Sequence, residues 1–235
     1  MVLVAALLAD DLDARAVVVT VMVVVWALRL GSFLFRRVRR DGSDGRFDRI
    51  KFDPLPFFMT WTLQGLWVLV TVACALAIVT GTDRESFGPF AVVGSVVWVA
   101  GFALEVLADR QKSTFRQQPE NADRFITTGL WRWSRHPNYF GEITLWTGIA
   151  IMAIPVLTGW RWVALVSPLF VVVLLTRISG IPALERRAAK RWGNDPDYER
   201  YVRATSVLVP RPPSRSPVPT SRSSRSIPSS RSGVT

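Results

Sequence analysis

The sequence predicts an all-α membrane protein, a polytopic bundle of about five transmembrane helices, possibly six. The chain of 235 residues is 49% hydrophobic and carries a formal net charge of +11, and its mean hydropathy is positive, at +0.25. Charged and apolar residues are separated into blocks, which is typical of chains that cross a bilayer. Five apolar segments account for the predicted spans, at about residues 14–35, 57–80, 89–108, 143–158 and 162–178.

The first two apolar segments are long enough to cross about 30 Å of hydrocarbon. The fourth and fifth are shorter and share the turn TGWRW at 158–162, which predicts a helical hairpin. Residues 1–9 are apolar but too short to span, and we interpret them as the remainder or an alternative start of a preceding helix. A signal peptide is the weaker alternative, because no small-residue cleavage site precedes a soluble domain.

Basic residues between the spans predict the orientation of the chain. The Lys and Arg counts are seven at 36–56, one at 81–88, six at 109–141, one at 159–161 and twelve from 177 onward. Because basic loops favour the cytoplasmic side, we expect the N-terminus outside and the C-terminus in the cytoplasm, in the plasma membrane. The excess of basic residues then reflects orientation in the bilayer, and no nucleic-acid partner is expected.

The composition divides the chain into two regions and excludes some kinds of site. Residues 1–210 form the predicted membrane domain, whereas residues 211–235 contain nine Ser, five Arg and five Pro and predict a disordered tail. Weak attraction of this tail to anionic lipid is an alternative. One cysteine, Cys74, and one histidine, His136, cannot form a disulfide framework or a zinc site, so no metal is expected.

Polar residues inside spans are costly and indicate function. If the third span stays helical through GFALEVLADRQKSTFRQQPE (101–120), then Glu105, Asp109, Lys112 and Arg116 share one face. The alternative is a helix end that pairs with itself, Asp109 with Lys112.

A second polar group in a span is Gln64, which lies near the start of the second segment. A buried amide there needs a partner. That partner is either another helix, which we favour, or a ligand.

The stretch SRHPNYFGE (134–142) contains the only histidine. Pro137 biases His136 away from the helical region and is itself favoured in the first turn of a helix. We therefore expect a helix to begin at this pair and to run into the fourth span. An interfacial histidine that caps its own helix is the alternative to a functional role for His136.

In that helix Asn138 and Glu142 lie four residues apart, on one face and within the first two turns. The free N–H groups and the positive end of the helix point to the cytoplasmic interface, which suits a phosphate group. Arg135 lies just upstream and adds a cation. Further on, residues 177–210 predict a basic amphipathic segment with a turn at 193–196, in which Tyr198 and Tyr201 could face a ligand.

The run GLWRWSRHPNYFGE, preceded by GFALEVLADRQKSTFR and followed by SGIPALE and Y-x-x-Y, resembles the DUF1295 branch of the steroid 5-alpha-reductase C-terminal-like superfamily. The upstream runs LRLGSFLFRR and LQGLW fit the same branch, so the resemblance covers about residues 26–210. It implies a multi-span fold whose cytoplasmic half closes around NADPH. It also implies hydride transfer to an electron-poor C=C bond of a lipid-like substrate.

The resemblance carries cofactor contacts over to Glu105, Asp109, Arg116, Asn138, Glu142 and Arg177. Together with the residues singled out above and the aromatic residue of the NYFGE run, the candidate cofactor-binding residues are Glu105, Asp109, Arg116, Arg135, His136, Asn138, Tyr139, Glu142, Arg177, Tyr198 and Tyr201.

The chain departs from the reductases at two positions. Glu105 stands where they usually have Asn, and their substrate-polarising Glu would fall on Gly65. Gln64 is a possible stand-in, but a neutral amide is a poor general acid. The catalytic proton donor is therefore unassigned.

Three functions follow from these patterns. The first is NADPH-dependent reduction of a C=C bond in a sterol-like, polyprenyl or fatty-acyl substrate. The second is an S-adenosylmethionine-dependent enzyme like the isoprenylcysteine carboxyl methyltransferases, which also carry an RHPxYxG run. The third is a non-catalytic accessory protein of a lipid-modifying complex, which Gly65 at the acid position keeps open. The bilayer and an apolar lipid-like substrate are the expected partners.

Overall fold

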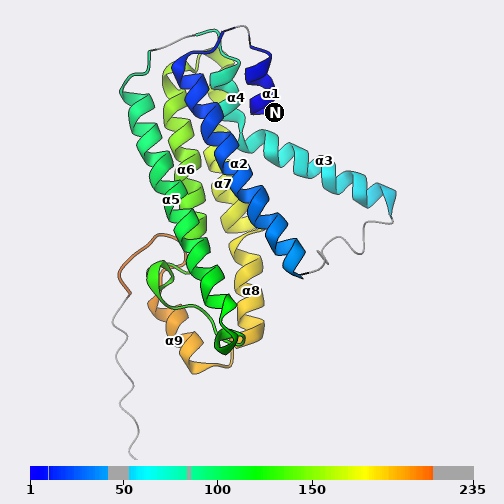
Figure 1. The fold of residues 1–235 in the computed structure, drawn as a ribbon, viewed down its shortest axis with the longest axis vertical. Helices are drawn as coiled ribbons and strands as arrows, with labels where there is room; N and C mark the ends of the chain where they lie inside the picture. The colour runs from blue at the N-terminus through cyan, green and yellow to red at the C-terminus, as the bar shows by residue number, and fades with distance from the viewer. Residues whose placement is uncertain (10, 42–52, 84–85, 214–235) are drawn as a thin grey trace, which may run out of the picture.

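The computed structural model describes residues 1–9, 11–41, 53–83 and 86–213, and all regular structure in these ranges is helical (Figure 1). The α-helices are α1 (Val2–Leu7), α2 (Ala14–Asp41), α3 (Pro54–Thr71), α4 (Ala73–Val79), α5 (Pro89–Gln117), α6 (Pro137–Ala153), α7 (Val166–Val173), α8 (Ile181–Trp192) and α9 (Pro196–Ala204). Short 3-10 or π turns connect them, namely η1 (Pro119–Asn121), η2 (Gly129–Arg132), η3 (Ile154–Val156), η4 (Gly159–Leu165) and η5 (Leu174–Ile178). The predicted all-α class is confirmed.

Four described stretches are long and apolar enough to cross a membrane, and a fifth is added if the bent pair α3 and α4 is one span. The four are Ala14–Arg36, Pro89–Gln117, Pro137–Val156 and Gly159–Trp192. The prediction of about five spans is confirmed, and the chain is an integral membrane protein. The orientation stays a prediction. Most of the basic stretch 36–56, and the tail from residue 214, lie outside the described residues.

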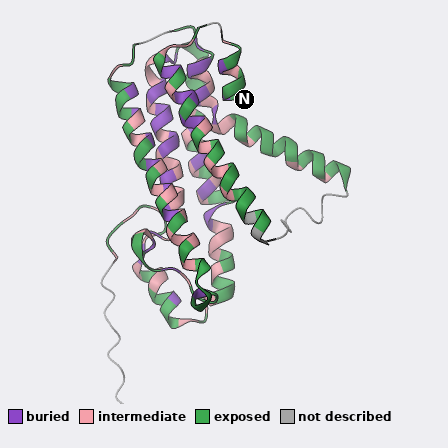
Figure 2. Ribbon diagram, viewed as in Figure 1, coloured by how far each residue is buried: buried purple, intermediate pink, exposed green. Residues whose placement is uncertain are grey.

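The second predicted span differs from a single helix. Residues 57–80 form α3 and α4, which are bent by 59° at a break next to Val72. In α4 small and branched side chains such as Ala75 and Val79 are buried in the bundle, whereas α3 has no buried residue. Figure 1 shows α3 leaning away from the other helices, and Figure 2 shows its exposed surface. The break therefore separates a half that is buried in the bundle from a half that has no buried residue.

Helices α5 and α6 run antiparallel, side by side, and pack with their backbones in contact (Figure 1). A Cβ atom at Gly141 would lie 2.7 Å from both the amide nitrogen of Glu105 and the carbonyl oxygen of Gly101. One at Gly148 would lie 2.6 Å from the carbonyl oxygen of Gly94. Small residues allow this approach, as they do in many membrane helix pairs. The glycine contacts thus fix the position of the two helices relative to each other along their axes.

Other helix boundaries agree with the sequence. Helix α6 begins at Pro137 with His136 at its N-cap, and α5 stays helical through Gln117. The amphipathic end of the chain forms α8 and α9, separated by a short turn. These segments place the charged ends of α5, α8 and α9 and the start of α6 at one end of the bundle (Figure 1).

Candidate functional site

A cluster of ionisable and polar side chains connects three spans inside the bundle. Arg29 of α2 pairs through Nη1 with Oε1 of Glu105 and through Nη2 with Oδ2 of Asp109, both on α5. Asn138 of α6 donates from Nδ2 to Oδ1 of Asp109 over 3.2 Å. The side chains of Arg29, Glu105 and Asp109 are 16%, 5% and 15% exposed. We call these four residues the Arg29 cluster.

The helices position this cluster through spacing and close packing. Glu105 and Asp109 are four residues apart on α5 and therefore share a face. The contact between Gly141 and the backbone of Glu105 brings the first turns of α6 beside them. Asn138 thereby reaches Asp109, and Glu142 interacts electrostatically with Arg29, Asp109 and Glu105. Four of the five carried-over residues of α5 and α6 thus lie together, namely Glu105, Asp109, Asn138 and Glu142.

Arg29 was not among the residues that the sequence singled out. It lies within the first apolar segment, so the rule that ionisable residues inside a span indicate function also applies to it. Its guanidinium pairs with the carboxyl groups of Glu105 and Asp109 and interacts electrostatically with that of Glu142. Oε2 of Glu105 is buried and has no hydrogen-bond partner. A buried acceptor without a partner is unusual in a folded protein, and it is a position that a ligand donor can satisfy.

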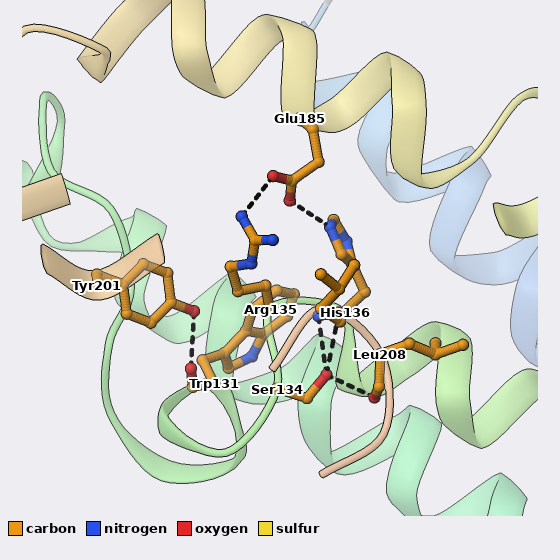
Figure 3. A network of polar contacts seen from close by, with 8 residues as sticks. Trp131, Ser134, Arg135, His136, Glu185, Tyr201 and Leu208 are labelled. Atoms are coloured by element: carbon orange, nitrogen blue, oxygen red, sulfur yellow. Dashed lines mark hydrogen bonds and ion pairs between the residues drawn. The ribbon is translucent and has the colours of Figure 1, made fainter. Parts of the chain in front are cut away.

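A second polar group holds α8 against the start of α6 (Figure 3). Glu185 of α8 accepts from Nη1 of Arg135 over 2.5 Å, and its other oxygen lies 2.7 Å from Nε2 of His136. Because a carboxylate only accepts, we assign the proton to Nε2 of His136. Nδ1 of His136 is buried without a hydrogen-bond partner, and so is Nε of Arg135. We call Arg135, His136 and Glu185 the Glu185 clamp.

The clamp and the Arg29 cluster are linked through one aromatic residue. The ring of Tyr139 stacks on that of His136, with ring centroids 5.6 Å apart and an angle of 10° between the planes. Tyr139 belongs to the same first turns of α6 as Asn138 and Glu142. The lone histidine therefore lies between a carboxylate partner on α8 and the polar face of α6.

The two predicted tyrosines of α9 have structural contacts. The hydroxyl of Tyr201 donates to the carbonyl oxygen of Trp131 over 2.7 Å (Figure 3), and Tyr198 packs its ring edge-on against Phe125. Burial raises the pKa of both hydroxyls, so both remain protonated at neutral pH. These contacts hold α9 against η2 and the segment that precedes it.

The end of the described chain runs along the segment before α6. The amide nitrogen of Arg135 donates to the carbonyl oxygen of Ser206 over 2.8 Å, and that of Arg211 donates to Trp133 over 3.0 Å. Oγ of Ser134 donates to the carbonyl oxygen of Leu208 over 2.7 Å. The approach to the predicted helix start is thus covered by the residues after α9.

The remaining predicted residues lie on the surface. Arg116 in the last turn of α5 and Arg177 in the π turn η5 are both exposed. Gln64 is exposed on α3, so it is not a buried amide bound to another helix. Within the described ranges, no three His, Cys, Asp or Glu side chains are grouped so that they could hold a metal ion.

Replacing Glu185 with glutamine should destabilise the protein by about 2 kcal/mol, because Arg135 and His136 lose a charged acceptor while they stay largely buried. Thermal unfolding of the detergent-purified protein, followed by tryptophan fluorescence, measures the change. The matched control is Glu199→Gln, which removes a surface pair with Arg203 at 3.4 Å and should change stability by less than about 0.5 kcal/mol. Equal effects of the two substitutions would contradict a stabilising clamp.

A buried polar cluster inside a bundle of membrane spans defines this protein as a polytopic membrane protein with an intramembrane polar site. The family model described as "Protein of unknown function (DUF1295)" matches residues 1–205. The chain therefore belongs to the DUF1295 family, as its motifs predicted.

Three proteins that are similar to this chain have names that state an enzymatic activity. The chain is 25% identical to 3-oxo-5-alpha-steroid 4-dehydrogenase 1 of Rattus norvegicus, over 52% of this chain and 42% of the relative. It is 27% identical to steroid 5-alpha-reductase DET2 of Gossypium hirsutum, over 54% and 45%. It is 25% identical to probable O-methyltransferase ustE of Ustilaginoidea virens, over 55% and 43%. The matches thus span less than half of each relative, and no solved structure matches the chain.

Proposed function

We propose that this protein is a membrane oxidoreductase that uses NADPH to reduce a C=C bond of a lipid, sterol-like or polyprenyl substrate. The observation that carries the proposal is the Arg29 cluster, in which Glu105, Asp109 and Asn138 come together at the positions carried over from the reductases. The names of the rat and cotton relatives support the same chemistry.

The residues present fit the two halves of NADPH. Oε2 of Glu105 is buried and has no hydrogen-bond partner, and a carboxamide N–H or a ribose hydroxyl would satisfy it. The side chains of Arg116 and Arg177 are exposed, and guanidinium groups are suitable partners for phosphate oxygens. These groups lie at the end of the bundle where the basic helices gather, which suits a cofactor that arrives from the cytoplasm.

The chemistry needs a hydride on one carbon of the C=C bond and a proton on the other. When bound, NADPH would supply the hydride and would be oxidised to NADP⁺. Glu105, Asp109 and Asn138 would orient the cofactor. Gln64 is exposed on α3 and the next residue is glycine, so we assign the proton donor to neither.

A second candidate is methyl transfer from S-adenosylmethionine. One observation favours it: Glu105 and Asp109 pair with Arg29, and Glu142 interacts with it electrostatically. The site thus has more carboxyl groups than guanidinium groups, which suits a sulfonium cation. The match to a probable O-methyltransferase points in the same direction. The two candidates differ in the charge of the cofactor, so a binding measurement separates them.

Cofactor binding to the full chain in detergent tests the proposal. NADPH should raise the unfolding temperature, and Asp109→Asn and Asn138→Ala should each weaken its affinity at least tenfold, about 1.4 kcal/mol. Asn194→Ala is the matched control, because Asn194 is exposed in the turn between α8 and α9. Stabilisation by S-adenosylmethionine alone would refute the reductase assignment, and unchanged affinity in both site variants would refute the location of the site.

A further inference from the structure

Helix α8 presents three basic side chains at the surface, those of Arg186, Arg187 and Lys190. Within the part of the chain that the structure describes, none of the three forms an ion pair or a side-chain hydrogen bond. Because an α-helix has 3.6 residues per turn, positions 186, 187 and 190 lie on one side of it. We call these three residues the α8 basic face.

The opposite side of α8 is held against the rest of the protein. Glu185 belongs to the clamp described above (Figure 3), and Nε1 of Trp192 donates to the carbonyl oxygen of Asp123 over 2.7 Å. Glu185 and Trp192 are about two turns apart and therefore share a side of the helix. Since both contacts lie across the helix from the α8 basic face, that face cannot turn inward without breaking them.

Neither the helix end nor neighbouring acids account for the α8 basic face. Basic side chains in the last turn of a helix are stabilised by its dipole, but of the three only Lys190 lies in that turn. On α9, by contrast, Arg200 and Arg203 each pair with a carboxylate of their own helix, over 3.1 and 3.4 Å. The α8 basic face therefore concentrates positive charge that no carboxylate of the described residues neutralises.

Helix α8 continues the last membrane span, Gly159–Trp192, which has 34 residues (Figure 1). Trp160 and Trp162 at the start of this stretch are exposed, as tryptophans at a membrane–water interface commonly are. Counted from there, about twenty residues cross the hydrocarbon, so the crossing ends near residue 182. At about 1.5 Å per residue, Arg186 then lies about 6 Å beyond the hydrocarbon, at the level of the lipid head groups.

We propose that the α8 basic face binds the head group of an anionic phospholipid in the leaflet at that end of the span. Guanidinium and ammonium groups form charge-assisted hydrogen bonds with phosphate oxygens, and an anionic leaflet attracts basic residues that adjoin a span. Exposed apolar side chains earlier in the same stretch, such as Leu169 and Val173, lie against the acyl chains. The face shares no residue with the Arg29 cluster, so this binding is independent of the proposed reaction.

Native mass spectrometry of the full chain, delipidated in detergent, tests the interaction with two lipids that have the same acyl chains. Phosphatidylglycerol carries a net negative charge, whereas phosphatidylcholine is zwitterionic. We expect phosphatidylglycerol to bind at least about tenfold more tightly, because each basic residue near an anionic surface contributes about fivefold. Higher salt should reduce this preference, since exposed charges are screened. Equal affinities of the wild type for the two lipids would overturn the proposal.

Two double variants locate the binding on α8. Arg186→Gln with Lys190→Gln removes two charges of the face and should lower the preference for phosphatidylglycerol at least about fivefold. Arg200→Gln with Arg203→Gln is the matched control, because it removes the same charge from α9 and should keep the preference. All four side chains are exposed, so both variants should unfold near the wild-type temperature. A preference that survives the α8 substitutions, or that the control lowers equally, would refute binding at the α8 basic face.

Discussion

Replacing Arg29 with alanine should destabilise the bundle by about 3–5 kcal/mol and abolish cofactor binding. The substitution leaves Glu105 and Asp109 in the bundle without their cation, and removal of one partner from a buried ion pair has a cost of this size. Thermal unfolding in detergent and a titration with the cofactor measure the two effects. Arg36→Ala is the matched control, because Arg36 is exposed on the same helix.

A compensating substitution tests whether charge is the cause. Adding Glu105→Gln to Arg29→Ala removes a carboxylate that has lost its partner, so the double variant should be more stable than Arg29→Ala alone. The two residues are in direct contact, and residues in contact show interaction energies of about 0.5–3 kcal/mol in such cycles. Additive effects, or equal stability of Arg29→Ala and Arg36→Ala, would contradict the role assigned to Arg29.

The features that could be predicted from the sequence have local causes. Helices in the spans follow from apolar runs of sufficient length, and the start of α6 follows from His136 and Pro137. Likewise, Glu105 and Asp109 share a face because a helix repeats every 3.6 residues. In each case the signal lies within a few turns of the residue concerned.

The features that could not be predicted depend on contacts between distant segments. Arg29 and Glu105 are 76 residues apart in the sequence, and Arg135 and Glu185 are 50 apart. A local pattern marks each residue as polar but does not name its partner. The break next to Val72 is of the same kind. It follows from the burial of α4 in the bundle, whereas α3 has no buried residue.

The spacing of the glycines on α5 and α6 is visible in the sequence, but a hydropathy pattern does not register it. Gly94 and Gly101 on α5 are seven residues apart, as are Gly141 and Gly148 on α6. Each lies where the two backbones meet. Since Asn138 reaches Asp109 only because the helices approach this closely, the glycines position the site as well as the fold.

Gly141→Leu should destabilise the protein by about 3 kcal/mol or more and weaken cofactor binding. Even the Cβ atom would lie 2.7 Å from backbone atoms of Glu105 and Gly101, and backbone cannot rotate away as a side chain can. The helices must separate, and overpacking of this kind usually costs about 1–3 kcal/mol and occasionally more. Separation would also pull Asn138 away from Asp109.

Gly65→Leu makes the same chemical change where an added Cβ atom has no heavy atom within 4 Å. Because Leu is a better helix former than Gly, this control should leave stability unchanged or raise it by up to about 1 kcal/mol. Thermal unfolding of both variants in the same detergent gives the comparison, and cofactor titration reports on the site. If Gly141→Leu were as stable as Gly65→Leu, the close contact of α5 and α6 would be wrong, and with it the route by which Asn138 joins the Arg29 cluster.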